Sequence, residues 1–230
     1  MPIRFRIPCL ASCAAVLSLA GGCLPYTVGS TAQTTPAHQR ETTTTWYSIP
    51  NAVDILGDSV TAPIFGVDAE WRAGLDDRSD VGIRIPSGSG VVATYKRRLL
   101  GDANPKAAAL AIMGGAGLVN WGEHAHVELT VMGSGRTARS LTPYGGIRLM
   151  QVAPLARGAP HDSPTAGGFF GLRIGSATLG ISPEIGVFYD RSALELRKRN
   201  FIVVPAISVH GDALASVLGP FGRGRSFPRR

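Results

Sequence analysis

The stretch of residues 64–99, IFGVDAEWRAGLDDRSDVGIRIPSGSGVVATYKRRL, alternates between apolar and polar side chains. On one face of its first segment the residues are apolar: Phe65, Val67, Ala69, Trp71, Ala73 and Leu75. On the other face they are charged or glycine: Asp68, Glu70, Arg72 and Gly74. Side chains alternate across a strand, so this pattern predicts adjacent antiparallel strands joined by the polar turns at residues 76–78 and 86–88. Charges of both signs deep within a strand are typical of a barrel with lipid outside and a packed polar lumen inside.

The composition excludes several other classes of protein. The chain has 230 residues, 29 glycines, 17% charged residues and a formal net charge of +7. The glycine excess and the low charge fit neither a helical bundle nor a disordered chain. After the N-terminus there is no run of about 18 apolar residues that would form a membrane-spanning helix. The positive charge is scattered and forms no basic helix, so we expect no nucleic-acid partner.

Four segments can be distinguished along the chain. Arg4 and Arg6 precede an apolar run that ends at Ala20, which is the pattern of a cleavable export signal. The next residues are rich in Thr, Ser, Gln and Pro and have little to bury, so they predict a flexible tether. The predicted segments are a signal peptide over residues 1–22, a flexible tether over 23–40, a β-barrel over 41–210 and a loose basic tail over 211–230.

The end of the signal contains a more specific motif. Leu-Ala-Gly-Gly-Cys at residues 19–23 resembles the bacterial lipobox. The resemblance implies that Cys23 becomes the first residue of a lipoprotein and carries acyl chains such as palmitate. An ordinary secretory signal with an incidental cysteine is the alternative. Because Cys9 and Cys13 lie inside the signal, acylation of Cys23 leaves no thiol for a disulfide or a cysteine metal site.

Ten segments after residue 40 have strand patterns. They predict an all-β fold, an antiparallel up-and-down β-barrel of about ten strands, with eight as the alternative. The three longest connections, at residues 50–63, 151–164 and 190–200, fall at one end, as is usual for outer-membrane barrels. The expected strands span residues 41–49, 64–75, 79–85, 89–99, 107–119, 124–133, 141–150, 167–174, 178–189 and 201–210.

Three runs of sequence resemble a known class of proteins. The runs Val67–Ile85, Val92–Gly101 and Thr142–Arg148 are similar to segments of small bacterial outer-membrane β-barrel proteins of uncharacterised role. The resemblance covers most of residues 64–210 and implies a location in the outer membrane of a Gram-negative-type envelope. Such proteins often end in a strand that closes on an aromatic residue, whereas the last strand here closes at His210 and a tail follows.

The charged faces of the predicted strands indicate the content of the lumen. A barrel of about ten strands is narrow and is largely filled by its side chains. Charges of opposite sign must pair there, because an isolated buried charge costs several kcal/mol. We therefore predict a salt-bridged lumen that is closed to solutes larger than ions. The residues expected to point inward are Asp68, Glu70, Arg72, Asp80, Arg84, Lys96, Arg98, Glu128, Arg148, Arg173 and Glu184.

Two histidines are the only metal candidates in this pattern. His124 and His126 lie on one strand face, a spacing that metals use, but no third ligand is evident and we prefer to interpret them as inward polar residues near the rim. The sequence has no Gly-x-Ser-x-Gly elbow and no phosphate-binding loop. We therefore expect no enzyme activity, no cofactor and no bound metal.

Two classes of function fit this pattern. The first is a non-enzymatic outer-membrane β-barrel lipoprotein with a structural or adhesive role, or a narrow conduit. The second is a soluble periplasmic barrel on a lipid tether that binds a small ligand. The exposed face distinguishes them, because a soluble barrel needs a polar outside. Expected partners are outer-membrane lipids, with lipopolysaccharide contacting the basic loop from Arg191 to Arg199.

Overall fold

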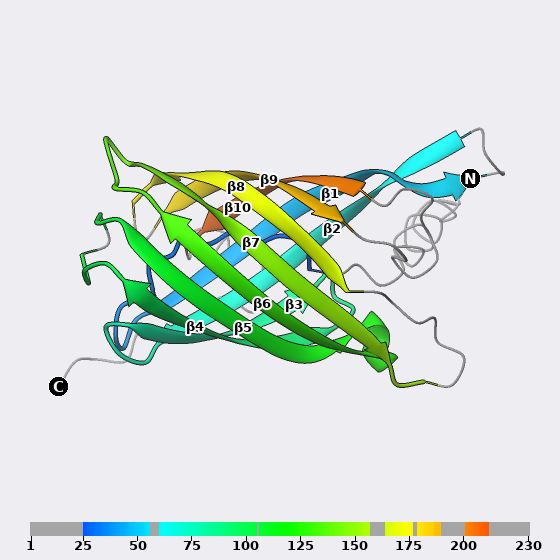
Figure 1. Ribbon diagram of the computed structural model, residues 1–230, viewed down its shortest axis with the longest axis horizontal. Coiled ribbons are helices and arrows are strands. Elements are labelled where there is room, and N and C mark those ends of the chain that lie inside the picture. The colour runs from blue at the N-terminus through cyan, green and yellow to red at the C-terminus, as the bar shows by residue number, and fades with distance from the viewer. Residues whose placement is uncertain are drawn as a thin grey trace, which may run out of the picture.

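Ten antiparallel strands close into a barrel in which β1 pairs with β10 (Figure 1). The computed structural model describes residues 25–55, 60–104, 106–156, 164–176, 179–189 and 201–211. The strands are β1 (Arg40–Ile55), β2 (Val60–Gly74), β3 (Ser79–Pro86), β4 (Val91–Leu100), β5 (Ala109–Val119), β6 (His124–Ser134), β7 (Leu141–Pro154), β8 (Thr165–Gly175), β9 (Gly180–Tyr189) and β10 (Phe201–His210), with a 3-10 turn, η1 (Asn120–Gly122), between β5 and β6. The predicted up-and-down barrel of about ten strands is confirmed. In the described part of the chain, no helix is long and apolar enough to cross a membrane.

The two ends of the barrel differ. We call the end where β1 turns into β2 the loop end, at the right of Figure 1, and the end where β2 turns into β3 the turn end. The predicted loop over residues 50–63 is wrong, because β1 and β2 continue as a long hairpin in which Val53 pairs with Ala62. The register shifts between Ile49 and Val53. Proline cannot donate to a ladder, so Pro50 falls where the pairing is interrupted.

The turn between β2 and β3 is closed by hydrogen bonds to a carboxylate. Ser79 Oγ donates to Asp76 Oδ2 over 2.6 Å, and the backbone N–H of Arg78 donates to Asp76 Oδ1 over 2.7 Å. These bonds favour the charged form and hold the pKa of Asp76 below its usual range. The turn is thereby kept short, which fixes the register of β2 against β3.

Burial along the strands is the reverse of that in a soluble protein. Large apolar residues point outward, and Phe65, Ile147 and Phe170 are 69%, 63% and 60% exposed. The charged residues point inward, and Asp80 and Arg148 are completely buried. Because side chains alternate across a strand, the same strand register directs the apolar residues outward and the charged residues inward.

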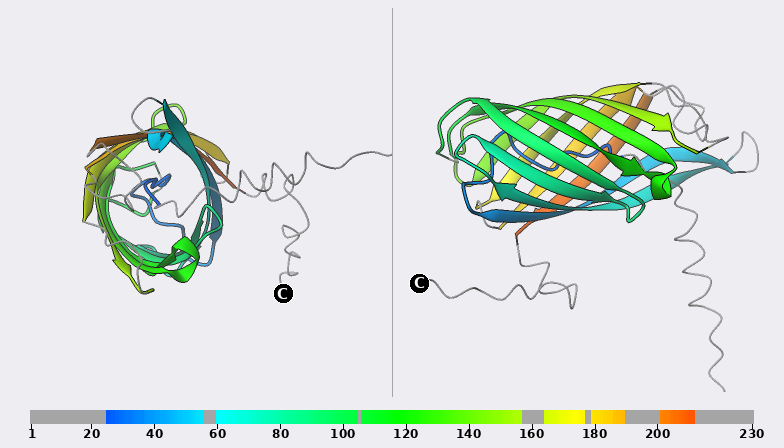
Figure 2. Two further views of the ribbon diagram at one scale, coloured as in Figure 1. Left: turned by 90° about the vertical axis from the view of Figure 1, so that its right-hand side faces the viewer. Right: turned by 90° about the horizontal axis from the view of Figure 1, so that it is seen from below.

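The chain before β1 lies inside the barrel. Residues 25–36, which we call the N-terminal segment, run through the ring of strands, as the dark blue trace in the left view of Figure 2 shows. Tyr26, Val28 and Ala32 are 1%, 3% and 0% exposed. The expectation of a flexible tether over residues 23–40 is therefore corrected for this segment. The composition predicted a tether because the segment has few apolar residues to bury. Its polar residues are buried because they contact polar groups in the lumen.

Three lumen aromatic rings each lie against a glycine on a neighbouring strand. Tyr47 is opposite Gly66, Tyr144 is opposite Gly171 and Phe188 is opposite Gly167. A methyl group on any of these glycines would overlap the ring. Glycine is therefore needed at these positions for space, and the rings fill the lumen beside the N-terminal segment.

We predict that Gly171→Ala destabilises the barrel by about 1–3 kcal/mol, because the added methyl displaces the Tyr144 ring from a packed site. The matched control is Gly168→Ala on the same strand, where the nearest atom to the new methyl is the Gly146 oxygen at 3.4 Å. Denaturant unfolding of the folded barrel in lipid measures both free energies. Equal stabilities of the two variants would show that the ring does not require the glycine.

Candidate functional site in the barrel lumen

The predicted charged residues all lie on the inner face of the barrel. Ten of the eleven are at most 6% exposed, and the side chain of Arg173 is 13% exposed. They come from seven different strands, as follows: Asp68, Glu70 and Arg72 on β2; Asp80 and Arg84 on β3; Lys96 and Arg98 on β4; Glu128 on β6; Arg148 on β7; Arg173 on β8; and Glu184 on β9. Closure of the barrel brings these separate strand faces around one lumen.

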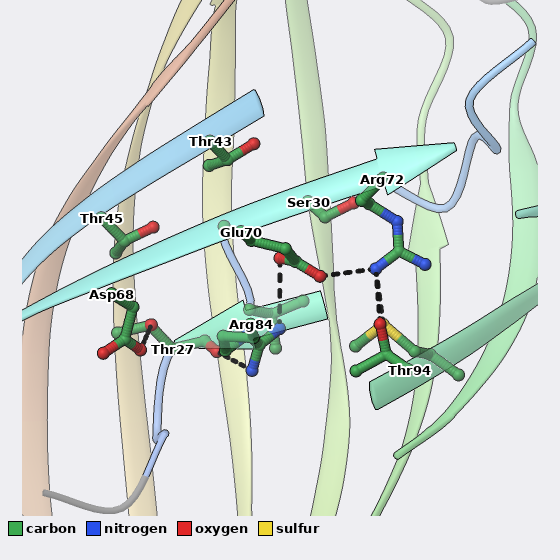
Figure 3. Close-up of polar contacts among 12 residues, drawn as sticks. Thr27, Ser30, Thr43, Thr45, Asp68, Glu70, Arg72, Arg84 and Thr94 are labelled. Atoms are coloured by element: carbon green, nitrogen blue, oxygen red, sulfur yellow. Dashed lines mark hydrogen bonds and ion pairs between the residues drawn. The ribbon is translucent and has the colours of Figure 1, made fainter. Parts of the chain in front are cut away.

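The β2–β4 wall holds the first group of ion pairs. Arg72 donates to Glu70 Oε1 over 2.6 Å and also contacts Asp80 (Figure 3 shows the Glu70 contact). Lys96 Nζ is 3.6 Å from Asp80 Oδ2. Arg84 is 3.4 Å from Glu70 Oε2, so Glu70 lies between two guanidinium groups. Each buried ion in this group has an opposite charge beside it, as the cost of desolvation demands.

A second group of charges lies on β6 and β7. Arg148 forms an ion pair with Glu128 Oε2, and His126 Nε2 is 2.9 Å from the same oxygen. Arg84 Nη1 is 3.8 Å from Glu128 Oε1, which joins this group to the first. Ion pairs therefore join these two groups into one network that crosses the barrel from β2 to β7.

The backbone of the N-terminal segment is bound by this network. The carbonyl oxygen of Thr27 accepts hydrogen bonds from both Arg84 and Arg148. Thr27 Oγ1 donates to Asp68 Oδ2 over 3.3 Å (Figure 3). One residue of the segment thus contacts three charged groups from three strands.

A carboxylate from the opposite wall holds the next two residues. The N–H groups of Val28 and Gly29 donate to Glu184 Oε1 and Oε2, each over 2.9 Å. The Tyr144 hydroxyl donates to Glu184 Oε2 over 3.0 Å. Hydrogen bonds to an ionised acceptor are stronger than neutral ones, so this carboxylate fixes the course of the segment.

The last part of the segment is held near the turn end. Lys96 Nζ donates to the carbonyl oxygen of Gln33 over 2.7 Å, and Arg98 donates to Gln33 Oε1 over 2.9 Å. The N–H of Thr35 donates to Asp80 Oδ2 over 2.8 Å. Lys96 and Asp80 therefore bind the segment and each other at the same time.

Gly29 lies at the seam where the barrel closes. Its φ of +58° is in the left-handed region, and a Cβ at this position would be 3.0 Å from Thr45 Oγ1 and would overlap Ser208 Oγ. Thr45 on β1 and Ser208 on β10 share a hydrogen bond of 2.7 Å. The segment thus passes directly beneath the β1–β10 contact, where a side chain at residue 29 would have to displace the Ser208 hydroxyl.

Sequence reasoning missed part of this arrangement. Glu41 Oε1 is 3.0 Å from Arg173 and 3.4 Å from His210 Nδ1 at the turn end. The predicted lumen residues comprised six basic groups and five acidic ones, and this imbalance was a sign that an acidic partner was missing. The N-terminal segment gave no such sign, because its Thr, Ser and Gln residues have no strand period.

Ser182, His210 and Glu41 at the turn end are residue types that can serve as a nucleophile, its general base and an acid that orients the base. Ser182 Oγ is 2.8 Å from His210 Nε2, and Nδ1 lies near both Thr43 Oγ1 and Glu41. Ser182 and His210 are each 1% exposed. A substrate cannot reach a hydroxyl that is buried in this way, so we interpret the cluster as part of the lumen packing.

The remaining predicted site residues are placed as follows. His126 contacts Glu128, and His124 Nδ1 is 3.3 Å from the Asn120 amide. Among the residues that the structure describes, no group of three His, Cys, Asp or Glu side chains is placed to hold a metal ion. Cys23 and the loop from Arg191 to Arg199 lie outside the described residues.

The geometry defines a closed ten-stranded barrel with an apolar exterior and an ionic lumen. No family model matches the sequence, and a search of curated proteins found no match. Among solved structures, Neisserial surface protein A (NspA) is similar with 11% identity, a TM-score of 0.37, and coverage of 75% of this chain and 95% of that one. The outer membrane protein OprG from Pseudomonas aeruginosa has 11% identity, a TM-score of 0.32, and coverage of 79% and 97%. Ail, the attachment invasion locus protein of Yersinia pestis, in complex with the heparin analogue sucrose octasulfate, has 11% identity, a TM-score of 0.29, and coverage of 75% and 96%.

We predict that Arg148→Met destabilises the barrel by about 3–5 kcal/mol, because Glu128 and the carbonyl of Thr27 lose a buried charged partner. In the double variant Arg148→Met, Glu128→Met, the loss is smaller than the sum of the two single losses. Denaturant unfolding of the four proteins gives the coupling free energy. Additive losses would contradict a direct interaction between these two residues.

Proposed function

We propose that this protein is a non-enzymatic β-barrel of a Gram-negative outer membrane, with a sealed lumen and a structural or adhesive role. The observation that carries the proposal is the reversed burial, with apolar side chains outside and paired charges inside. A barrel surrounded by lipid requires this distribution, whereas a soluble barrel requires its opposite.

The exposed apolar surface is too large for a soluble monomer. It continues around the barrel, with Trp71 on β2, Ile83 on β3, Leu129 on β6 and Ile185 on β9 each between 45% and 52% exposed. Monomeric soluble proteins rarely expose contiguous apolar patches of more than a few hundred Å². The alternative of a lipid-tethered soluble barrel with an apolar ligand cavity is therefore not favoured.

A role in passing solutes is also not favoured, because the lumen is occupied. The N-terminal segment lies along the axis, and charged side chains around it bind one another or the backbone and side chains of the segment. The loop end is then the part of the barrel available for contact with other molecules. We propose that the basic loop from Arg191 to Arg199 contributes there by contact with lipopolysaccharide, whose phosphates are anionic.

The N-terminal cysteine motif completes the proposal. Cleavage before Cys23 and acylation of its thiol would make this a lipoprotein with two membrane attachments, the barrel and the lipid. Several acyl chains at one residue bind a bilayer firmly, whereas a single chain binds only marginally.

The first test uses a Cys23→Ala variant with a generic cleavable signal peptide. We expect this variant to stay in the envelope membrane through washes with alkaline carbonate and urea, because the strands themselves are embedded in lipid. The wild-type chain, washed in parallel, is the control. Release of the variant into the wash would mean that lipid was the sole anchor and would overturn the membrane barrel.

The second test measures conductance across planar bilayers. We expect the full chain to form no stable large channels, because the N-terminal segment fills the lumen. A variant lacking residues 26–34 should conduct, provided that heat-dependent gel mobility shows that it folds. Large channels from the full chain, or equal conductance of the two folded proteins, would show that the segment does not seal the barrel.

A further inference from the structure

We infer that the acylated N-terminus is threaded through its own barrel, so that the lipid on Cys23 is held at the loop end and enters the outer leaflet of the membrane. The inference rests on the proposed function, from which it takes the outer-membrane location and the acylation of Cys23. It adds the route of the N-terminal segment through the lumen and the membrane leaflet that the lipid enters. Neither the barrel nor the cysteine motif indicates these alone.

The path follows from contacts at both ends of the N-terminal segment. At the loop end, Tyr26 packs against Phe188 with ring centroids 5.3 Å apart, in a cluster with Val92 and Val119. At the turn end, Gln33 Nε2 donates to the carbonyl oxygen of Ala107 over 2.8 Å. The chain therefore enters at the loop end, crosses the lumen and leaves at the turn end, where β1 begins at Arg40.

Chain length then fixes the end at which the lipid is found. A residue spans at most about 3.6 Å of extended chain, so the two steps along the chain from Pro25 to Cys23 cover no more than about 7 Å. The lumen between Tyr26 and the turn end is already occupied by the rest of the segment. We therefore assign the lipid proposed on Cys23 to the loop-end side of Tyr26.

At the loop end, β3 is shorter than the neighbouring β2, so the barrel wall is lower there. Pro86, the last residue of β3, pairs with Asp68, whereas β2 extends as far as Val60. The β3–β4 turn is joined to η1 by a hydrogen bond from the Trp121 N–H to the Ser89 carbonyl, and Trp121 is 80% exposed. Exposed tryptophan is favoured at a membrane interface, so the acyl chains reach lipid over this rim.

The orientation of the barrel decides which leaflet receives the lipid. Outer-membrane barrels have short turns on the periplasmic side and longer connections on the outer side. The two longest connections between strands, residues 155–164 and 190–200, lie at the loop end. The acylated residue thus faces the outer surface, while β10 ends with His210 at the turn end, on the opposite side.

Threading also constrains assembly. The lumen holds a network of ion pairs, and an acylated terminus cannot be drawn through it after closure. The segment must be in place when β1 joins β10, and Gly29 lies beneath that seam. The barrel therefore closes around its own N-terminal segment.

The test labels intact cells with a membrane-impermeant maleimide. One protein carries a Gly-Ser-Cys-Ser-Gly insertion between Leu24 and Pro25, and two controls carry Leu155→Cys at the loop end or Asp102→Cys at the turn end. We expect the insertion and Leu155→Cys to react on intact cells, and Asp102→Cys to react only after permeabilisation. Incorporation of an alkynyl palmitate into the wild-type chain and its loss in Cys23→Ala report acylation separately.

Two other results would overturn the inference in distinguishable ways. If Leu155→Cys reacts on intact cells but the insertion reacts only after permeabilisation, the terminus is not threaded and the proposed membrane barrel remains. If Leu155→Cys is also protected, the orientation in the outer membrane fails, and the inference fails with it. If the wild-type chain incorporates no palmitate, Cys23 is not acylated and the proposed position of the lipid is wrong.

A covalent test of threading does not depend on labelling in cells. A Cβ at Gly29 would be 3.3 Å from the Ser208 Cβ, close to the separation found in disulfides. In the Cys23→Ala background, Gly29→Cys with Ser208→Cys should lose both thiols on oxidation, as counted by alkylation and mass spectrometry. Gly29→Cys alone is the control. Two free thiols in a correctly folded double variant would overturn the threaded path.

Discussion

The structure depends on the pairing of charges that are removed from water. A barrel with lipid outside must direct its polar side chains inward, and a narrow lumen leaves little water to solvate them. Glu41 brings the acidic lumen groups to six, which matches the six basic ones: Arg72, Arg84, Lys96, Arg98, Arg148 and Arg173. Charge balance is necessary but not sufficient, because each ion also needs hydrogen-bond partners at close range.

The N-terminal segment supplies those partners from its backbone. Its carbonyl groups accept from Arg84, Arg148 and Lys96, and its N–H groups donate to Glu184 and Asp80. An extended chain suits this role because it has unpaired donors and acceptors along its whole length. The charged wall and the backbone of the N-terminal segment therefore satisfy each other's hydrogen-bonding groups.

The strands could be predicted from the sequence because their pattern is local. The alternation from Phe65 to Leu75 indicates both the secondary structure and the face that each residue occupies, so the inward charges could be identified from the sequence alone. The continuation of β1 past Pro50 was missed because proline usually ends a strand. Such an interruption is tolerated in a hairpin when the register shifts.

The course of the N-terminal segment could not be predicted for a different reason. Thr27 and Val28 contact residues 41 to 156 positions away, and their own composition is that of a linker. Burial of such residues is favourable only because the barrel closes a ring of charges around them. Contacts that depend on the closed lumen leave no periodic pattern in the segment itself.

Amide hydrogen exchange in lipid nanodiscs measures whether the N-terminal segment is bound within the lumen. The N–H groups of Val28, Gly29 and Thr35 are bonded to buried carboxylates, so we predict that they exchange as slowly as the amides of the barrel strands. Exchange at the rate of an unstructured peptide, in a barrel whose strand amides are protected, would contradict it.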